Sequence, residues 1–209
     1  MPHNRRVALT LTGADATALI VVDMQNGFCH PDGSFARLGL DIGMCTAAIP
    51  PCARLTAAAR AAGVPVVLTR YVYRADYRDG GVLVEEILPA LREVSSLAAG
   101  TWDAALVDEL APEPADFVID KNRYSAFYGT GLEPVLNSLH IRSVVVCGVT
   151  TNMCVETTAR DASQRDYRTF VVADATGELD RARHDAALAT LGFGFGAVVT
   201  TDEVLAAWS

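Results

Sequence analysis

The sequence has no apolar run of about 18 residues, the length that a membrane-spanning helix needs. It is also poor in basic residues: 17 lysines and arginines stand against 25 acidic residues, a net charge of −8. Because nucleic-acid binding needs a dense basic surface, this balance argues against such partners. The first residues, MPHNRRVALTLTG, lack the apolar core and cleavage site of a signal peptide. We therefore expect a cytoplasmic protein that binds neither membranes nor nucleic acids.

Paired cysteines and clustered histidines are missing as well. The five cysteines are an odd number without a paired framework, which is typical of free thiols in a reducing compartment. Zinc and iron prefer imidazole or thiolate ligands, and the four histidines form no cluster of that kind. We expect no metal and no cofactor.

What the sequence does contain is an alternation of apolar strands and helical segments. Hydrophobic residues make up 51% and charged residues 20%, as in a compact globular protein. The alternation predicts an α/β fold, a three-layer α/β/α sandwich in one domain over residues 1–209, with ligands at the carboxyl ends of the parallel strands. The predicted strands are Ala18–Val22, Val64–Tyr71, Phe117–Lys121, Ser143–Gly148, Arg168–Ala173 and Ala197–Thr201.

Capping signals mark several helices between these strands. An alanine-rich helix is predicted over residues 47–62, ended by Gly63 and Pro65, and another over residues 180–191, closed by Gly192. The segments 130–133 and 200–203 both read as capping boxes that open helices. Residues 71–116 are irregular, with short helices expected near residues 83–91 and 103–110; long excursions of this kind often cover a site.

The segment RSVVVCGVTTNMCVETTARD, residues 142–161, carries the strongest chemical signal. A buried strand meets Gly148, turns, and opens a helix with Cys154 in its first turn. The positive end of a helix favours thiolate, so this position suits a nucleophile. Most free cysteines simply pack in the core, however, so the assignment depends on partners.

Two such partners are expected at the same edge of the sheet. Asp23 follows the first strand directly and Lys121 ends the third. Alone, a strand-end aspartate is often a turn cap and a strand-end lysine is usually solvated. A carboxylate, an ammonium and a thiol that converge from distant segments predict a catalytic group.

The motifs ALIVVDMQNGF, DKNRYSAF and VVVCGVTTNMCVETTARDA resemble those of the isochorismatase-like cysteine hydrolases. That family includes N-carbamoylsarcosine amidase, biuret hydrolase, ureidoacrylate amidohydrolase and nicotinamidases. The resemblance implies a six-stranded parallel sheet in the order 3-2-1-4-5-6, an Asp23–Lys121–Cys154 triad, and a homodimer or homotetramer. It also implies an oxyanion hole from the Thr150 and Cys154 N–H groups, with a cis peptide between Val149 and Thr150.

The residue types suggest their roles in cleaving a C–N bond of a small amide or ureide. Cys154 would attack the carbonyl carbon and form a thioester, while Asp23 moves the proton. Lys121 would hold Asp23 and lower the thiol pKa. Because the third strand is not adjacent to the first, Lys121 has to reach across the second.

Four other interpretations compete with an amidohydrolase, two of them other activities of the same family. Nicotinamidases of the family carry a metal-binding Asp-x-His after the second strand, where this chain has LTRYVYRADYRDGG without histidine. True isochorismatases hydrolyse a vinyl ether and generally lack the cysteine. A Rossmann-like binding protein finds support only in LGFGFGA, which precedes a strand instead of following one. A catalytically inactive scaffold or interaction protein is the fourth alternative.

The substrate-binding residues are less well defined. Phe28 is expected to line the pocket, Asn26 to hydrogen-bond an amide, and Val149 to lie beside the substrate. Tyr71 and Arg74 belong to an aromatic and basic stretch, residues 71–78, that suits either a carboxylate clamp or a subunit interface. Arg123 and Tyr124, which follow Lys121, share this ambiguity. Among the other cysteines, Cys29 is the one candidate for a second reactive thiol, and a surface loop is its expected place.

Overall fold

Six apolar runs form six strands, all parallel, in the order β3-β2-β1-β4-β5-β6. The predicted sheet and its strand order are therefore confirmed. The central strands are buried along their whole length, which explains why their sequences do not alternate with polar residues. The strands are β1 (Thr17–Val22), β2 (Val66–Tyr71), β3 (Phe117–Lys121), β4 (Ser143–Val149), β5 (Arg168–Gly177) and β6 (Ala197–Val199).

The structure is a computed structural model that describes residues 14–209. Two of the predictions concern residues 1–13: that they belong to the single domain, and that they form no signal peptide. Both predictions lie outside the described residues. None of the helices in residues 14–209 combines the length and the apolar character that a bilayer-crossing segment requires.

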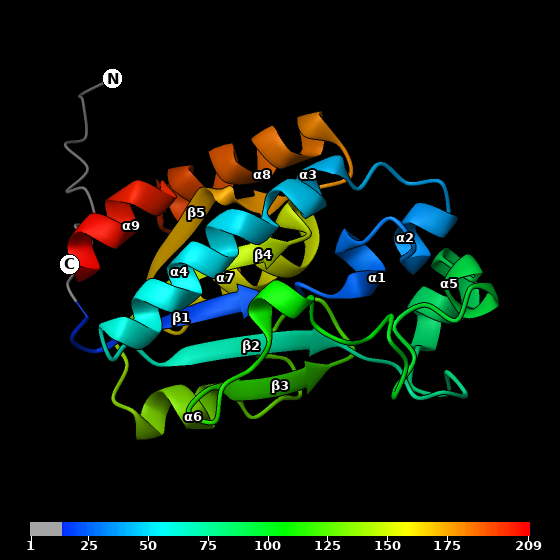
Figure 1. Ribbon diagram of the computed structural model, residues 1–209, viewed down its shortest axis with the longest axis horizontal. Helices are drawn as coiled ribbons and strands as arrows, with labels where there is room; N and C mark the ends of the chain where they lie inside the picture. The colour runs from blue at the N-terminus through cyan, green and yellow to red at the C-terminus, as the bar shows by residue number, and fades with distance from the viewer. Residues whose placement is uncertain (1–13) are drawn as a thin grey trace.

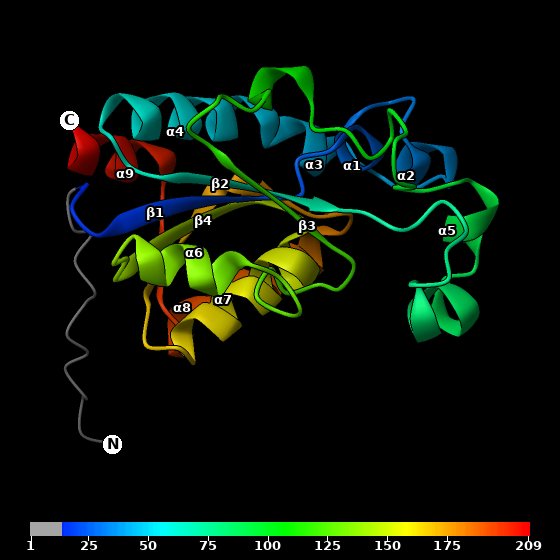
Figure 2. The same cartoon turned by 90° about the horizontal axis from the view of Figure 1, so that it is seen from below.

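Helices cover both faces of the sheet, as the predicted three-layer sandwich requires (Figure 2). One layer holds α3 (Gly43–Ala47), α4 (Ile49–Ala61) and α9 (Thr201–Trp208). The other layer holds α6 (Leu132–Ser138), α7 (Glu156–Ser163) and α8 (Arg181–Gly194).

Helix boundaries test the predicted capping signals. The box at Thr200 and Glu203 is present and opens α9. The box predicted over residues 130–133 is wrong: α6 begins after Gly131, and Glu133 instead contacts Arg165 at 3.1 Å. Helix α8 also continues through Gly192, since one glycine inside a helix costs only about 1 kcal/mol. The helix predicted over residues 47–62 is divided at Ala48 into α3 and α4.

Most of the irregular chain lies beyond the carboxyl ends of the strands, to the right of the arrowheads in Figure 1. The β1–α4 connection holds α1 (Asn26–Cys29) and α2 (Ser34–Arg37). The long β2–β3 excursion holds the π-helix η1 (Leu83–Ile87), α5 (Ala90–Glu93) and the 3₁₀ helix η2 (Asp108–Leu110). The two are joined through Asp103, whose carboxylate accepts hydrogen bonds from the backbone N–H groups of Ser34 and Leu97 at 2.7 and 2.8 Å.

The edge strand β3 is aligned with β2 so that Lys121 pairs with Tyr71. The preceding pair, Arg70 and Asp120, carries a two-pronged ion pair on the exposed side, with N–O distances of 2.7 and 2.9 Å. Side chains alternate along a strand, so Asp120 is exposed and Lys121 is buried. This register directs Lys121 into the protein.

Candidate active site

Asp23, Lys121 and Cys154 come together at the carboxyl ends of the strands. Lys121 Nζ lies 2.6 Å from Asp23 Oδ2 and 3.4 Å from Cys154 Sγ. The lysine crosses β2 over the ring of Tyr71, with Nζ 4.4 Å from the ring centroid. Its four-carbon side chain is thus long enough to reach Asp23, although β2 lies between β3 and β1. The side chains of Asp23 and Lys121 are fully buried.

Thr69 of β2 completes the surroundings of the Asp23 carboxylate. Its hydroxyl donates to Asp23 Oδ1 at 2.6 Å, while its carbonyl accepts the Asp23 N–H at 3.1 Å. Asp23 itself has a left-handed backbone (φ 52°), which aspartate tolerates better than most residues. Sequence reasoning did not identify Thr69; its position two residues before Tyr71, on the same side of β2, is the signal that would have found it.

The electrostatics of Cys154 differ from the expected preformed thiolate. Burial raises the pKa of the Cys154 thiol above its usual value, and the nearby charge of Lys121 only partly offsets this; Asp23 raises the pKa further. The expected contribution of a helix N-terminus is also reduced, because Cys154 lies in a five-residue π-helix, η3 (Thr151–Val155), that precedes α7. The resting residue is therefore a neutral thiol.

The pKa of Lys121 depends more on its charged neighbours than on burial. Burial lowers the pKa of its ammonium, but the charges of Asp23 and Cys154 and the hydrogen bonds to them outweigh burial and raise the pKa above its usual value. The ammonium also donates to the carbonyl of Arg123 at 3.2 Å. Lys121 therefore stays charged and its donors are engaged by the protein.

Gly148 allows β4 to lie against the end of β1 just before the nucleophile. Its φ is +110°, and a Cβ atom at this position would lie 2.1 Å from the carbonyl oxygen of Val22. Only glycine fits such an approach. The next peptide bond, between Val149 and Thr150, is cis.

Hydrogen bonds from the end of β5 and from α8 hold the turn after Gly148 in place. Glu178, which is 1% exposed, accepts the Asn152 N–H at 2.9 Å. The Thr151 hydroxyl contacts the carbonyl of Gly177 at 3.0 Å and His184 Nδ1 at 2.9 Å. Sequence reasoning missed Glu178, which follows the predicted end of the fifth strand; the strand actually extends to Gly177. His184 lies in the predicted helix over residues 180–191 and was given no role there.

A cavity of about 300 Å³ opens in front of Cys154. Besides Cys154, four residues of the predicted site line it: Phe28, Tyr71, Tyr124 and Thr150. Most of the remaining wall is apolar and comes from α2 and its loop, from the β2–β3 excursion and from the segments around Cys154 and Glu178. These wall residues are Phe35, Leu38, Leu40, Tyr73, Leu83, Leu88, Ala90, Leu91, Leu97, Met153, Leu179, Glu178 and Arg183.

Four predicted substrate-binding residues do not line this cavity. The Asn26 amide donates to the Trp102 carbonyl at 3.0 Å and so fastens the β2–β3 excursion to α1. The Arg74 side chain forms a two-pronged ion pair with Asp76 at 3.0 Å on the exposed surface. Val149 is completely buried at the end of β4.

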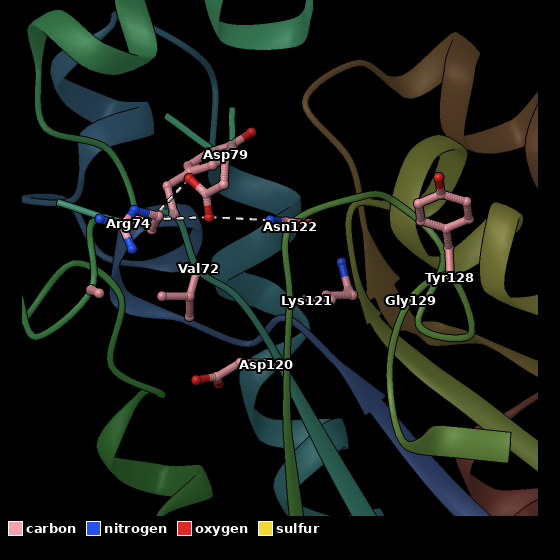
Figure 3. A pocket seen from close by; sticks show the side chains of 10 residues that line it. Val72, Arg74, Asp79, Asp120, Lys121, Asn122, Tyr128 and Gly129 are labelled. Atoms are coloured by element: carbon pink, nitrogen blue, oxygen red, sulfur yellow. Dashed lines mark hydrogen bonds between the residues drawn. The ribbon is translucent and has the colours of Figure 1, made fainter. Parts of the chain in front are cut away.

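Arg123 is the fourth of these residues, and its guanidinium donates to the carbonyls of Asp79 and Asn122 at 3.0 and 2.6 Å. Asp79, Asn122 and Arg74 belong to a second hollow beside the ends of β2 and β3 (Figure 3). There the Asp79 carboxylate accepts from the Arg74 backbone and from the Asn122 amide. The stretch 71–78 is therefore divided, with Tyr71 and Tyr73 at the Cys154 cavity and Arg74 outside it.

The other cysteines are packed in the interior. Cys29 belongs to α1 and is 1% exposed, so its expected place in a surface loop is wrong; burial raises the pKa of its thiol. Cys45, Cys52 and Cys147 are fully buried. Within residues 14–209 no three His, Cys, Asp or Glu side chains are grouped so that they could hold a metal ion.

Comparison with known proteins identifies the family and supports the fold. The isochorismatase domain model matches residues 17–203. Ureidoacrylate amidohydrolase RutB of Methylorubrum extorquens is 41% identical over 195 residues, covering 84% of this chain and 78% of that protein. The protein of that name from Pseudomonas syringae pv. syringae is 37% identical over 205 residues, covering 92% and 84%.

Solved structures show the same fold. A cysteine hydrolase from Pseudomonas syringae pv. phaseolicola superposes with a TM-score of 0.83 at 34% identity, covering 92% of each chain. N-carbamoylsarcosine amidase from Thermoplasma acidophilum gives a TM-score of 0.71 at 30% identity, covering 89% of this chain and 96% of that one. With a family match that spans nearly all of the described residues, this chain belongs to the isochorismatase domain family.

Proposed function

We propose that this protein is a cysteine hydrolase that cleaves the C–N bond of a small amide or ureide. The observation that carries the proposal is the position of Lys121 Nζ, in contact with both Asp23 Oδ2 and Cys154 Sγ beside a cavity. The names of relatives, ureidoacrylate amidohydrolase and N-carbamoylsarcosine amidase, support a reaction at a C–N bond other than a peptide bond.

In the first half of the reaction, Cys154 Sγ attacks the carbonyl carbon and its proton passes to Asp23. Because the resting thiol is neutral, proton transfer accompanies the attack. Backbone N–H groups of Thr150 and Cys154 stabilise the oxyanion, a contribution of about 2.7–4 kcal/mol for one donor in a comparable site. The C–N bond then breaks, Asp23 returns the proton to the departing nitrogen, and a thioester remains on Cys154.

In the second half, a water molecule adds to the thioester carbonyl while Asp23 takes one of its protons. The C–S bond breaks, the acid product leaves, and the thiol recovers its proton. Lys121 stays protonated throughout and holds the Asp23 carboxylate in place through its hydrogen bond. Histidine is not needed as a base, since Asp23 serves both halves.

An ammonia-release assay over small amides and ureides tests the function. We expect turnover by the wild type and a loss of at least about 1,000-fold in Cys154→Ala, with an acyl adduct on Cys154 in the mass spectrum of the quenched wild type. Undiminished turnover in Cys154→Ala would disprove the nucleophile. We also propose that the protein forms a homodimer or homotetramer, as the family resemblance implies, which sedimentation would test. Its unpaired cysteines favour the cytoplasm.

A further inference from the structure

We propose that the cavity beside Cys154 contains a carboxylate-binding site, formed by Arg183 of α8. The substrate is then an amide or ureide that also carries a carboxylate. This inference rests on the amidohydrolase function proposed above and names the substrate class of the same cavity. The sequence suggests a carboxylate clamp in residues 71–78, but Arg74 lies outside the cavity, whereas Arg183 lines it.

The guanidinium of Arg183 has unengaged hydrogen-bond donors. Among residues 14–209, Arg183 is the only arginine that lines this cavity, and about half of its side chain is exposed to solvent. The nearest carboxylate oxygen, Glu178 Oε1, lies 3.7 Å from Arg183 Nη2, which is an ion-pair distance but is longer than a hydrogen bond. The fork of N–H groups that arginine offers to a carboxylate is therefore available to a ligand.

Glu178 holds the guanidinium beside the cavity without occupying its N–H groups. Glu178 is 1% exposed, and its two carboxylate oxygens accept the N–H groups of Asn152 and Leu179, both at 2.9 Å. The backbone thus fixes the carboxylate, and its charge attracts Arg183. A long side chain that is already oriented loses less conformational freedom when it binds a ligand.

The first turn of α8 directs Arg183 to the cavity and Arg181 away from it. The backbone N–H of Arg183 donates to Asp180 Oδ1 at 2.9 Å, which fixes the start of the helix. Residues two apart on a helix lie about 200° apart around its axis. Arg181 accordingly does not line the cavity; it pairs with Asp185 at 2.9 Å, and its side chain is 76% exposed.

The rest of the wall leaves the orientation of a ligand to a few polar groups. Most other lining residues are apolar or aromatic, among them Phe28, Leu88 and Leu97. The ammonium of Lys121 is already engaged by three protein groups. On an apolar wall each polar group strongly limits how a ligand lies. We therefore expect the carbon chain of the substrate to lie along the apolar wall and its carboxylate to meet Arg183.

Tyr124 supplies a second unengaged donor, on the side of Lys121. Its ring lies 6.4 Å from the ring of Tyr71, and Lys121 Nζ lies 4.4 Å from the centroid of the latter. Within the described part of the chain the Tyr124 hydroxyl has no hydrogen-bond partner. Burial raises the pKa of this hydroxyl, so it keeps its proton at neutral pH. Tyr124 therefore suits the amide or ureide group, and Arg183 the carboxylate.

Two matched pairs of compounds test the site by ammonia release: 3-ureidopropionate with butylurea, and succinamate with pentanamide. The members of each pair share the head group and a similar chain length but differ in the carboxylate. In the pair that reacts faster, we expect the wild type to favour the carboxylate member by about 10- to 100-fold in kcat/KM. Arg183→Leu should reduce this preference to about one. A wild type that favours the neutral member, or an unchanged preference in Arg183→Leu, would overturn the inference.

Two further variants separate the charge of Arg183 from general effects on the cavity. Arg181→Leu removes an arginine of the same helical turn that does not line the cavity, and it should keep the wild-type preference. Tyr124→Phe removes only the hydroxyl and should lower kcat/KM for both members of a pair alike. A preference that is lost in Tyr124→Phe and kept in Arg183→Leu would place the carboxylate at the tyrosine and refute its assignment to Arg183.

Calorimetric titration of Cys154→Ala measures binding without turnover. The carboxylate member of the faster pair should bind at least about tenfold more tightly than its neutral partner, and the advantage should disappear when Arg183→Leu is added. Equal dissociation constants would refute the carboxylate site and leave the proposed hydrolase intact. Absence of ammonia release from every amide and ureide, with no acyl adduct on Cys154, would instead refute the proposed function and the substrate class with it.

Discussion

Thr69 donates its hydroxyl proton to Asp23 Oδ1 at 2.6 Å, on the carboxylate oxygen opposite the one that contacts Lys121. The base of the proposed reaction is thus held from two strands, and its orientation depends on Thr69 as well as on Lys121. Thr69 contacts no substrate in this scheme and acts through Asp23.

Replacing Thr69 by valine should therefore lower kcat by about 10- to 100-fold, since a hydrogen bond to a charged group contributes about 1.5–3 kcal/mol. Thr69→Ser keeps the hydroxyl and should retain most of the activity. Equal losses in both variants would indicate a packing role instead.

The buried pair of Asp23 and Lys121 makes a prediction about stability. Lys121→Met leaves Asp23 as a buried charge without its cation and should reduce the free energy of unfolding by about 3–5 kcal/mol. The double variant with Asp23→Asn removes both charges and should recover most of that loss, while remaining inactive. Urea unfolding monitored by circular dichroism measures both. A double variant as unstable as Lys121→Met alone would contradict this account.

The protonation state of Cys154 makes a prediction about alkylation. Because its pKa is raised, the fraction of thiolate should grow about tenfold per pH unit through pH 9, where an ordinary thiol of pKa about 8.5 is already levelling off. The rate of iodoacetamide labelling at Cys154, followed by peptide mass spectrometry from pH 6 to 10, should therefore rise without a plateau. A plateau below about pH 8 would reveal a thiolate and ammonium pair at rest.

The hydrogen bonds of Glu178 predict that it stabilises the turn between Gly148 and Cys154. Its carboxylate accepts two backbone N–H groups, and an amide oxygen can replace only one of its two acceptor atoms. Glu178→Gln should then lower kcat about tenfold or more and reduce the stability by about 1–3 kcal/mol through the unsatisfied group. Glu156→Gln, on the neighbouring helix α7, is the control and should stay within about twofold in kcat.

We expect replacement of Arg74 to have little effect on activity. Its ion pair with Asp76 lies on the surface, where such pairs contribute about 0–1 kcal/mol. Arg74→Ala should therefore change kcat/KM by less than about twofold, whereas Phe28→Ala, inside the cavity, should reduce it by about tenfold or more. A large effect of Arg74→Ala on steady-state rates would place this arginine at the substrate after all.

The part of the fold that could be predicted from the sequence is the part that repeats a simple physical pattern. A run such as Val144–Val146 is buried on both faces, and a polar residue at the end of such a run marks the sheet edge. Asp23 and Lys121 could be found in this way because parallel strands bring their ends together. The order of the strands came from the family resemblance and not from those patterns.

The cavity could not be predicted in the same way. Its wall depends on the β2–β3 excursion, where no period of two or 3.6 residues exists and where tertiary hydrogen bonds such as those of Asp103 fix the path. Chemical type alone predicts that arginine and asparagine side chains bind the substrate. In the structure Arg74 and Asn26 satisfy groups of the protein, which only the coordinates of their neighbours reveal.

The ion pair between Arg70 and Asp120 lies on the outside of the sheet, yet it helps to decide the alignment of an edge strand. If β3 moved by one residue along β2, Lys121 would turn to the solvent side and Asp120 would be carried inward beside Asp23. Two carboxylates would then face each other where a cation is needed. The alignment of this edge strand therefore determines whether a positive or a negative charge lies beside the Cys154 thiol. A shift of one residue would leave the strand order unchanged but would remove the cation that the proposed reaction needs.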